Sequence, residues 1–117
     1  NKPVIFRKNI SNLKESLLTD ISTLQSEYKS TAIITKDYKE AEEIYDLLKD
    51  NINLSLIDAN TKKFQKNLIV IPAYIAKGLE FDSVIIYNDR NNSYRKNERN
   101  LLYVACTRCQ HELYIYN

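Results

Sequence analysis

Glycine is nearly absent from this sequence, which limits the nucleotide sites that the chain can build alone. The single glycine among 117 residues is Gly78. A phosphate-binding loop of the form GxxxxGK[ST] needs two glycines, and a dinucleotide-binding fingerprint needs more. The chain therefore cannot cradle phosphates in either of these ways.

Several other residue types are scarce or missing. The sequence has no tryptophan, no methionine even at position 1, one histidine and two cysteines. It has no run of about eighteen apolar residues, and its first stretch, NKPVIFRKNI, lacks the long apolar segment of a signal peptide. We therefore expect a cytoplasmic domain with no membrane partner, and the first residue, Asn1, suggests a fragment of a longer chain.

Charge of either sign is not in large excess. Seventeen basic and fifteen acidic residues give a net charge of +2, far from the strong basic excess that by itself indicates a nucleic-acid-binding protein. The balance of charge therefore leaves the class of partner open.

The pattern of apolar residues predicts an α/β fold. Aliphatic or β-branched runs predict strands, several of them without strict alternation, as in strands buried on both faces, at residues 3–7, 31–35, 53–57, 67–72, 83–87 and 112–116. Helical periodicity predicts helices near residues 10–28, 37–48 and 97–108, with polar loops at 58–66 and 88–96. Alternating strands and helices indicate a three-layer sandwich with a mostly parallel sheet. Asp37, followed by Glu40, is the predicted N-cap of the second helix.

The stretch VACTRCQH, residues 104–111, admits three interpretations. A redox pair is disfavoured because Cys106 and Cys109 follow a helix, where the dipole destabilises a thiolate. A metal site would have only His111 as a third ligand, so two packed cysteines are favoured over it. The third interpretation centres on Arg108, which follows Thr107 and can reach a phosphate with paired hydrogen bonds or simply face the helix dipole.

A short turn between two predicted strands fixes the direction of the Glu80 carboxylate. The strand at 67–72 ends at Pro72, residues 73–77 can form one helical turn, and Gly78 can end that turn in the left-handed conformation. The next strand follows at once, so the direction of Glu80 is fixed. From spacing alone, Glu80 could equally be a solvated edge residue and Gly78 an ordinary turn glycine.

Two segments together resemble one family. AKGLEFDSVII (76–86) resembles motif V, and ERNLLYVACTRCQHEL (98–113) resembles motif VI, of the UvrD/Rep-type superfamily 1 helicases. These segments cover about a quarter of the chain. The resemblance implies that residues 1–117 form the second, C-terminal RecA-like domain of an ATP-dependent DNA helicase or translocase, a fold of the P-loop NTPase type that here lacks its own P-loop.

The resemblance also implies roles for individual residues. Arg108 corresponds to the arginine that contacts the γ-phosphate of ATP, and Glu80 to the acid that contacts the ribose. Lys77, Gly78 and Thr107 are expected to shape the ATP-binding loop. ATP with Mg²⁺ is the implied cofactor, and the ligands of Mg²⁺ are expected on a missing first RecA-like domain, so this chain alone is expected to be inactive.

The sequence departs from most relatives where they touch nucleic acid. Pro72 and Tyr74 stand where relatives have a threonine and a histidine that contact the nucleic-acid backbone. VIPAYIAKGLEFDSVII resembles the HelD branch, helicase-like ATPases that associate with RNA polymerase. The expected partners are therefore the first RecA-like domain, DNA and RNA polymerase. The alternative is a non-catalytic α/β module that docks a protein, which predicts that Arg108 and Glu80 lie far apart.

Overall fold

The chain forms one six-stranded sheet in which all pairs of strands are parallel. The computed structural model describes residues 3–9, 11–61, 67–87 and 95–116, with the side chains of the last range described from residue 99 onward. The sheet has the order β1-β6-β5-β2-β4-β3. The elements are β1 (Val4–Lys8), α1 (Leu13–Glu27), β2 (Thr31–Thr35), α2 (Tyr38–Leu48), β3 (Ser55–Leu56), β4 (Leu68–Pro72), α3 (Ala73–Ala76), β5 (Phe81–Tyr87), α4 (Arg95–Arg108) and β6 (Cys109–Tyr116).

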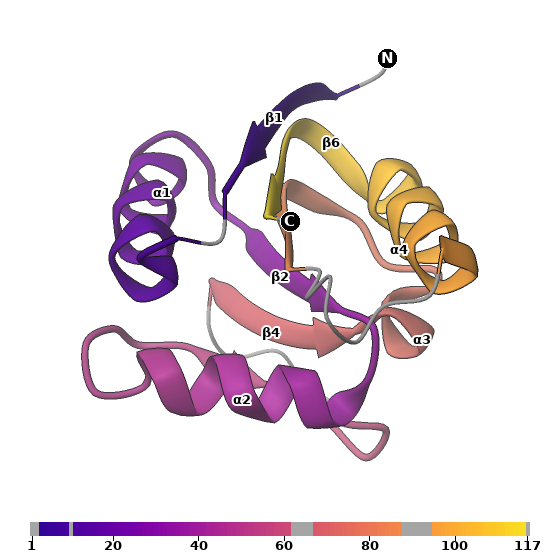
Figure 1. Ribbon diagram of the computed structural model, residues 1–117, viewed down its shortest axis with the longest axis horizontal. Helices are drawn as coiled ribbons and strands as arrows, with labels where there is room; N and C mark the ends of the chain where they lie inside the picture. The colour runs from indigo at the N-terminus through magenta and orange to yellow at the C-terminus, as the bar shows by residue number, and fades with distance from the viewer. Residues whose placement is uncertain (1–2, 10, 62–66, 88–94, 117) are drawn as a thin grey trace.

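Helices cover both faces of the sheet, which confirms the predicted three-layer sandwich. Figure 1 shows α1 and α2 on one side and α3 and α4 on the other. Alternate residues of the central strands feed the two layers, so Ile33 of β2 packs with α1 and α2, whereas Ile34 packs with α3 and α4. Because β2, β4 and most of β5 are buried on both faces, their aliphatic runs lack polar alternation.

Most predicted elements appear near their predicted bounds, and the differences concern mainly the short strand in the middle of the chain and its last helix and strand. The strand predicted at 112–116 begins three residues earlier, at Cys109, because pairing with β5 starts at Phe81↔Cys109. The helix predicted at 97–108 begins at Arg95, inside the loop predicted at 88–96. The strand predicted at 53–57 keeps only Ser55–Leu56. Parts of the predicted loops, residues 62–66 and 88–94, lie outside the described residues.

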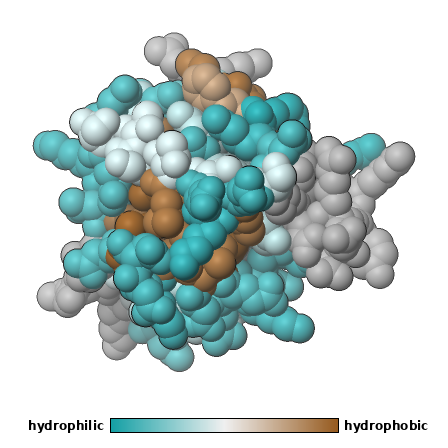
Figure 2. Space-filling view, turned by 60° about the vertical axis from the view of Figure 1, so that its left-hand side comes forward, coloured by the Kyte–Doolittle hydropathy of each residue, from teal (hydrophilic) through white to brown (hydrophobic). Residues whose placement is uncertain are grey.

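The first strand, β1, is exposed along its whole length. It is an edge strand that pairs only with β6. Val4 is 57%, Ile5 48% and Phe6 38% exposed. Figure 2, which turns α1 and α2 toward the viewer, shows apolar surface at the top of the molecule, where β1 lies, and a second apolar area framed by hydrophilic residues.

Because the strands are parallel, they all begin on one side of the sheet and end on the opposite side. We call the edge where the strands begin the amino edge and the edge where they end the carboxyl edge. β4 ends at Pro72 on the carboxyl edge, and β5 begins at Phe81 on the amino edge, with only α3 and residues 77–80 between them. This short connection on the α3/α4 face brings Tyr74 and Glu80 to opposite edges.

Candidate functional site

Glu80 and Arg108 both lie at the amino edge. Arg108 is the last residue of α4 and Glu80 directly precedes β5, and the residues that follow them, Cys109 and Phe81, are paired in the sheet. The Gln110 side chain Nε2 donates a hydrogen bond of 2.8 Å to Glu80 Oε2. Strand register therefore places Arg108 and Glu80 at the same edge, each directly before one residue of the pair Phe81↔Cys109.

Arg108 is half-buried and is held by its neighbour in the chain. Arg108 Nε donates to Thr107 Oγ1 at 3.2 Å, and Thr107 Oγ1 donates to the Val104 carbonyl at 2.9 Å. Within the described residues no carboxylate forms an ion pair with the guanidinium. A guanidinium that is fixed at its Nε and keeps its terminal N–H groups unpaired is suited to bind a phosphate or carboxylate from another molecule.

The turn before Glu80 has the predicted conformation. Gly78 has a φ of 84°, in the left-handed region, and the Leu79 amide donates to the Ala76 carbonyl at 3.1 Å. A Cβ placed on Gly78 would meet no atom within 4 Å. Glycine is therefore favoured here by its backbone angle rather than by crowding. Lys77, just before it, is exposed.

A polar network that the sequence did not predict links the starts of β2 and β5 at the amino edge. Asp82 Oδ2 accepts hydrogen bonds of 3.2 Å from the amides of Lys29 and Ser30, and the Asp82 amide donates to Ser30 Oγ at 2.9 Å. Thr31 Oγ1 and Ser83 Oγ lie 2.9 Å apart. In the sequence, the polar dipeptides Ser30-Thr31 and Asp82-Ser83 stand at the start of two apolar runs. Only the register of β2 and β5, with Thr31 opposite Ser83, shows that the two dipeptides are neighbours.

Two rings stack on the same edge. His111 lies parallel to Tyr28, with 5.3 Å between the ring centroids and 10° between the planes. The Tyr28 hydroxyl donates to Glu112, and this hydrogen bond is the largest cause that raises the pKa of Tyr28 to about 12. The only histidine of the sequence therefore packs against an aromatic ring.

The two cysteines have the environment of packing residues. Both thiols are free, Cys106 half-buried and Cys109 buried. Cys109 Sγ donates to the Glu112 carbonyl at 2.9 Å, and burial raises the pKa of Cys109 to about 11. A thiol with such a pKa is a poor nucleophile near neutral pH. In the part of the chain that the structure describes, no group of three or more His, Cys, Asp or Glu side chains is arranged to hold a metal ion.

Pro72 and Tyr74 lie at the carboxyl edge, away from Glu80 and Arg108. Pro72 is the last residue of β4, where it pairs with Thr35, and its side chain is buried. Tyr74 is 57% exposed. The predicted site residues thus form two groups on opposite edges of the sheet, and of the pair at the carboxyl edge only Tyr74 presents its side chain to solvent.

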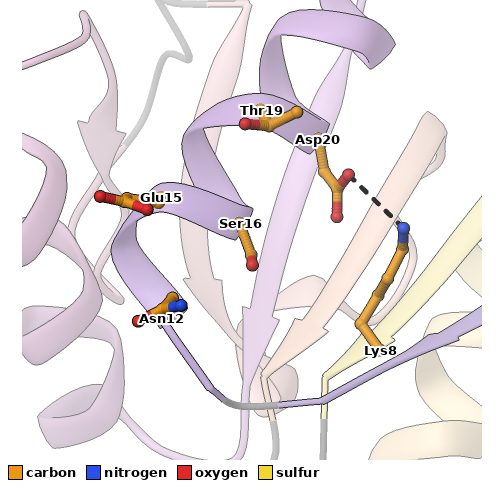
Figure 3. Close-up of a pocket in the computed structure, with 6 residues that line it drawn as sticks. All are labelled: Lys8, Asn12, Glu15, Ser16, Thr19 and Asp20. Atoms are coloured by element: carbon orange, nitrogen blue, oxygen red, sulfur yellow. Dashed lines mark ion pairs between the residues drawn. The ribbon is translucent and has the colours of Figure 1, made fainter.

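A hollow of about 350 Å³ lies on the α1 side of β1 and contains none of the predicted site residues. Its lining comes from the end of β1 and the first turns of α1, as Figure 3 shows: Lys8, Asn12, Glu15, Ser16, Thr19 and Asp20. Lys8 Nζ lies 3.7 Å from Asp20 Oδ1, and the other Asp20 oxygen accepts a hydrogen bond from Tyr116. Lys8 and Asp20 are therefore paired with each other.

The helices that the structure describes include none long and apolar enough to cross a membrane.

Comparison with known proteins identifies the family. The model of the UvrD-like helicase C-terminal domain matches residues 5–117. The crystal structure of the C-terminal domain of a possible DNA helicase from Lactobacillus plantarum is 34% identical, with a TM-score of 0.79 over 99% of this chain and 73% of that one. Domain 2 of the DEAD-box helicase Mss116p, bound to an RNA duplex, is similar in fold alone, at 12% identity and a TM-score of 0.50 over 97% of this chain and 53% of that one.

No curated protein gives a significant match. The family match covers nearly the whole chain, and the similar helicase domain has the same fold over nearly all of this chain. The chain therefore belongs to the family of UvrD-like helicase C-terminal domains.

Proposed function

We propose that this chain is the second motor domain of an ATP-dependent DNA helicase or translocase, and that Arg108 and Glu80 complete an ATP site whose remainder lies on a first RecA-like domain. The observation that carries the proposal is that Glu80 and Arg108 directly precede two paired residues at one edge, and that no described carboxylate forms an ion pair with the guanidinium. The single glycine fits this division, because the phosphate loop must then come from the other domain.

Each side chain has a definite task in this proposal. When ATP and Mg²⁺ are bound, charge develops on the transferred phosphoryl group, and Arg108 neutralises part of it with paired N–H donors. Glu80 keeps Oε2 on Gln110, while no described residue bonds Oε1, which can accept from a ribose hydroxyl. Lys77 and Gly78 set the approach of that carboxylate, and Thr107 fixes the guanidinium through Nε.

Nucleic acid would then lie at the opposite, carboxyl edge, near Tyr74. The Mg²⁺ ligands would lie on the first domain. We retain the HelD-like assignment and an association with RNA polymerase as predictions that follow from VIPAYIAKGLEF. The alternative, a non-catalytic docking module, predicts that Arg108 and Glu80 lie on different surfaces, and their common edge supports the ATPase proposal instead.

Replacing Arg108 by lysine in the complete helicase tests the proposal. Arg108→Lys keeps the positive charge but loses the paired phosphate contacts, so turnover should fall at least about a hundredfold while ATP affinity changes only several-fold. Steady-state ATPase assays and nucleotide titration measure the two quantities. Arg99→Lys, an exposed change on the same helix, is the control and should leave turnover unchanged. Unchanged turnover in Arg108→Lys would return this arginine to a structural role.

A further inference from the structure

The pairing between β5 and β6 contains a β-bulge at the amino edge. The register of the two strands shifts at Asp82, so that two residues of β6, Gln110 and His111, stand opposite this single residue of β5. A bulge of this kind redirects side chains and is common beside active sites. His111 stacks on Tyr28. Gln110, in contrast, reaches Glu80.

The amide of Gln110 can face Glu80 in only one orientation. Gln110 Nε2 donates to Glu80 Oε2 at 2.8 Å. An ionised carboxylate has only acceptor atoms, so the amide must offer it the NH2 group and not its carbonyl oxygen. Gln110 Oε1 is therefore left as an acceptor, and no residue that the structure describes donates a hydrogen bond to it.

Glu80 and Gln110 together present two acceptor oxygens. Glu80 Oε1, like Gln110 Oε1, has no donor among the described residues, and both side chains are exposed. The hydrogen bond between the two side chains keeps these oxygens near each other. Two adjacent hydroxyl groups, each with one O–H to donate, match such a pair of acceptors. The hydroxyls of a ribose ring are groups of this kind, and acidic side chains bind them in other nucleotide sites.

Gln110 lies close in the chain to the residue proposed to bind phosphate. Arg108 and Gln110 flank Cys109, which is 5% exposed and is the residue where pairing of β6 with β5 starts. Because Cys109 is fixed in the core, the side chains before and after it start from fixed positions. One short stretch therefore supplies a donor for phosphate and an acceptor for a sugar hydroxyl.

We propose that Gln110 is a specificity-determining residue of the ATP site. Its Oε1 accepts from one ribose hydroxyl while Glu80 Oε1 accepts from the other, so the site selects ribonucleoside over deoxyribonucleoside triphosphates. The inference rests on the proposed function for the presence of ATP, and it adds Gln110 and selection by the sugar. Since both side chains are exposed, water replaces a missing hydroxyl, and the loss is that of one net hydrogen bond, about three- to tenfold in affinity.

Nucleotide analogues test the proposal in the complete helicase before any residue is changed. KM for 2′-deoxy-ATP and for 3′-deoxy-ATP should each exceed KM for ATP by about three- to tenfold. Since the lost hydrogen bond contributes equally to the ground state and the transition state, kcat should stay within about twofold. Steady-state hydrolysis assays measure both constants. Equal KM values for the three nucleotides would overturn the proposal.

A change at Gln110 then assigns the selection to this side chain. Gln110→Met keeps a long unbranched side chain without the amide, so the ratio of KM for 2′-deoxy-ATP to KM for ATP should fall toward one, because KM for ATP rises. Gln25→Met, the same change at an exposed glutamine of α1, is the matched control and should keep the parent ratio. The proposal is wrong if Gln110→Met keeps the parent ratio, if it lowers only kcat, or if Gln25→Met shifts the ratio equally.

Two further comparisons separate this proposal from the ATP site itself and from misfolding. Arg108→Lys should lose turnover with ATP and 2′-deoxy-ATP alike while the ratio of their KM values stays, so each proposal can fail without the other. Glu80→Ala removes the partner of Gln110, so adding Gln110→Met to it should change the ratio no further, and an additional change would contradict the pairing. Circular dichroism melting should show these variants folded, and the analogues with the parent protein carry the test if one is not.

Discussion

Cys109 is a buried thiol that resists ionisation in the folded chain. It is 5% exposed, and its Sγ donates to the Glu112 carbonyl. Burial raises its pKa from 9.0 to about 11. Tyr116, fully buried at the far end of the same strand, has its pKa raised in the same direction by burial and by its hydrogen bond to Asp20. Both groups therefore favour the folded state only while they are protonated.

These raised pKa values predict a loss of stability in alkali. A group whose pKa is higher in the folded state contributes its full stability below the unfolded pKa and loses it as the pH rises toward the folded pKa. The free energy of unfolding should therefore be flat up to about pH 9 and should fall by about 2 kcal/mol toward pH 11 as unfolded thiols ionise. Urea titrations at several pH values measure the free energy of unfolding. In Cys109→Ala this free energy should fall less between pH 9 and pH 11. A constant urea midpoint up to pH 11 would contradict the argument.

At the scale of single elements, α2 shows how a local signal specifies a helix. Asp37 has extended backbone angles and its side chain accepts from the Glu40 amide, which satisfies one of the free N–H groups of the first turn. The sequence predicts this cap because all its parts lie within four residues. α1, in contrast, starts after Asn12 with no side-chain cap.

The cap makes a measurable contribution to stability. Asp37→Ala removes the acceptor and should lower the free energy of unfolding by about 1 kcal/mol, whereas Asp37→Asn keeps an acceptor and should cost less than half of that. Urea denaturation at pH 7 compares the two variants with the parent. Equal losses in both would assign the effect to the negative charge of Asp37 rather than to the hydrogen bond.

Features that depend on distant partners escape prediction from the sequence. The periodicity predicts most helices and strands, but the CQH start of β6 has no strand pattern of its own and is fixed by pairing with β5. The turn at Gly78 is local and was predicted, and its φ of 84° confirms it. The bond from Gln110 to Glu80 and the Asp82 network both require knowledge of which strands are neighbours.

At the scale of the whole molecule, the order of strands determines how well the amides of each strand are protected from solvent. β2, β5 and β4 occupy interior positions between the helical layers, whereas β1 and the two-residue β3 lie at the edges. Edge strands leave one row of backbone groups unpaired within the sheet. β1 also presents three apolar side chains to solvent.

Amide hydrogen exchange should follow this gradient. We expect amides of β2 and β5 to exchange most slowly, at rates set by global unfolding, and those of β1 to exchange at least about tenfold faster because they open locally. Mass spectrometry of the 117-residue chain at pH 7 measures the order. Protection of β1 equal to that of β5 would mean that another surface, such as a second copy of the chain, covers the edge in solution.

The connection between β4 and β5 is short and contains a tight turn. β4 ends at Pro72 and β5 begins at Phe81, and between them lie α3 (Ala73–Ala76) and residues 77–80. The Leu79 amide donates to the Ala76 carbonyl, which closes the turn through Gly78, whose φ is 84°.

This connection joins the two edges of the sheet through a few residues of chain. Tyr74 lies at the carboxyl edge and Glu80 at the amino edge. The turn fixes where the chain emerges before Glu80, so the connection leaves little room for an insertion.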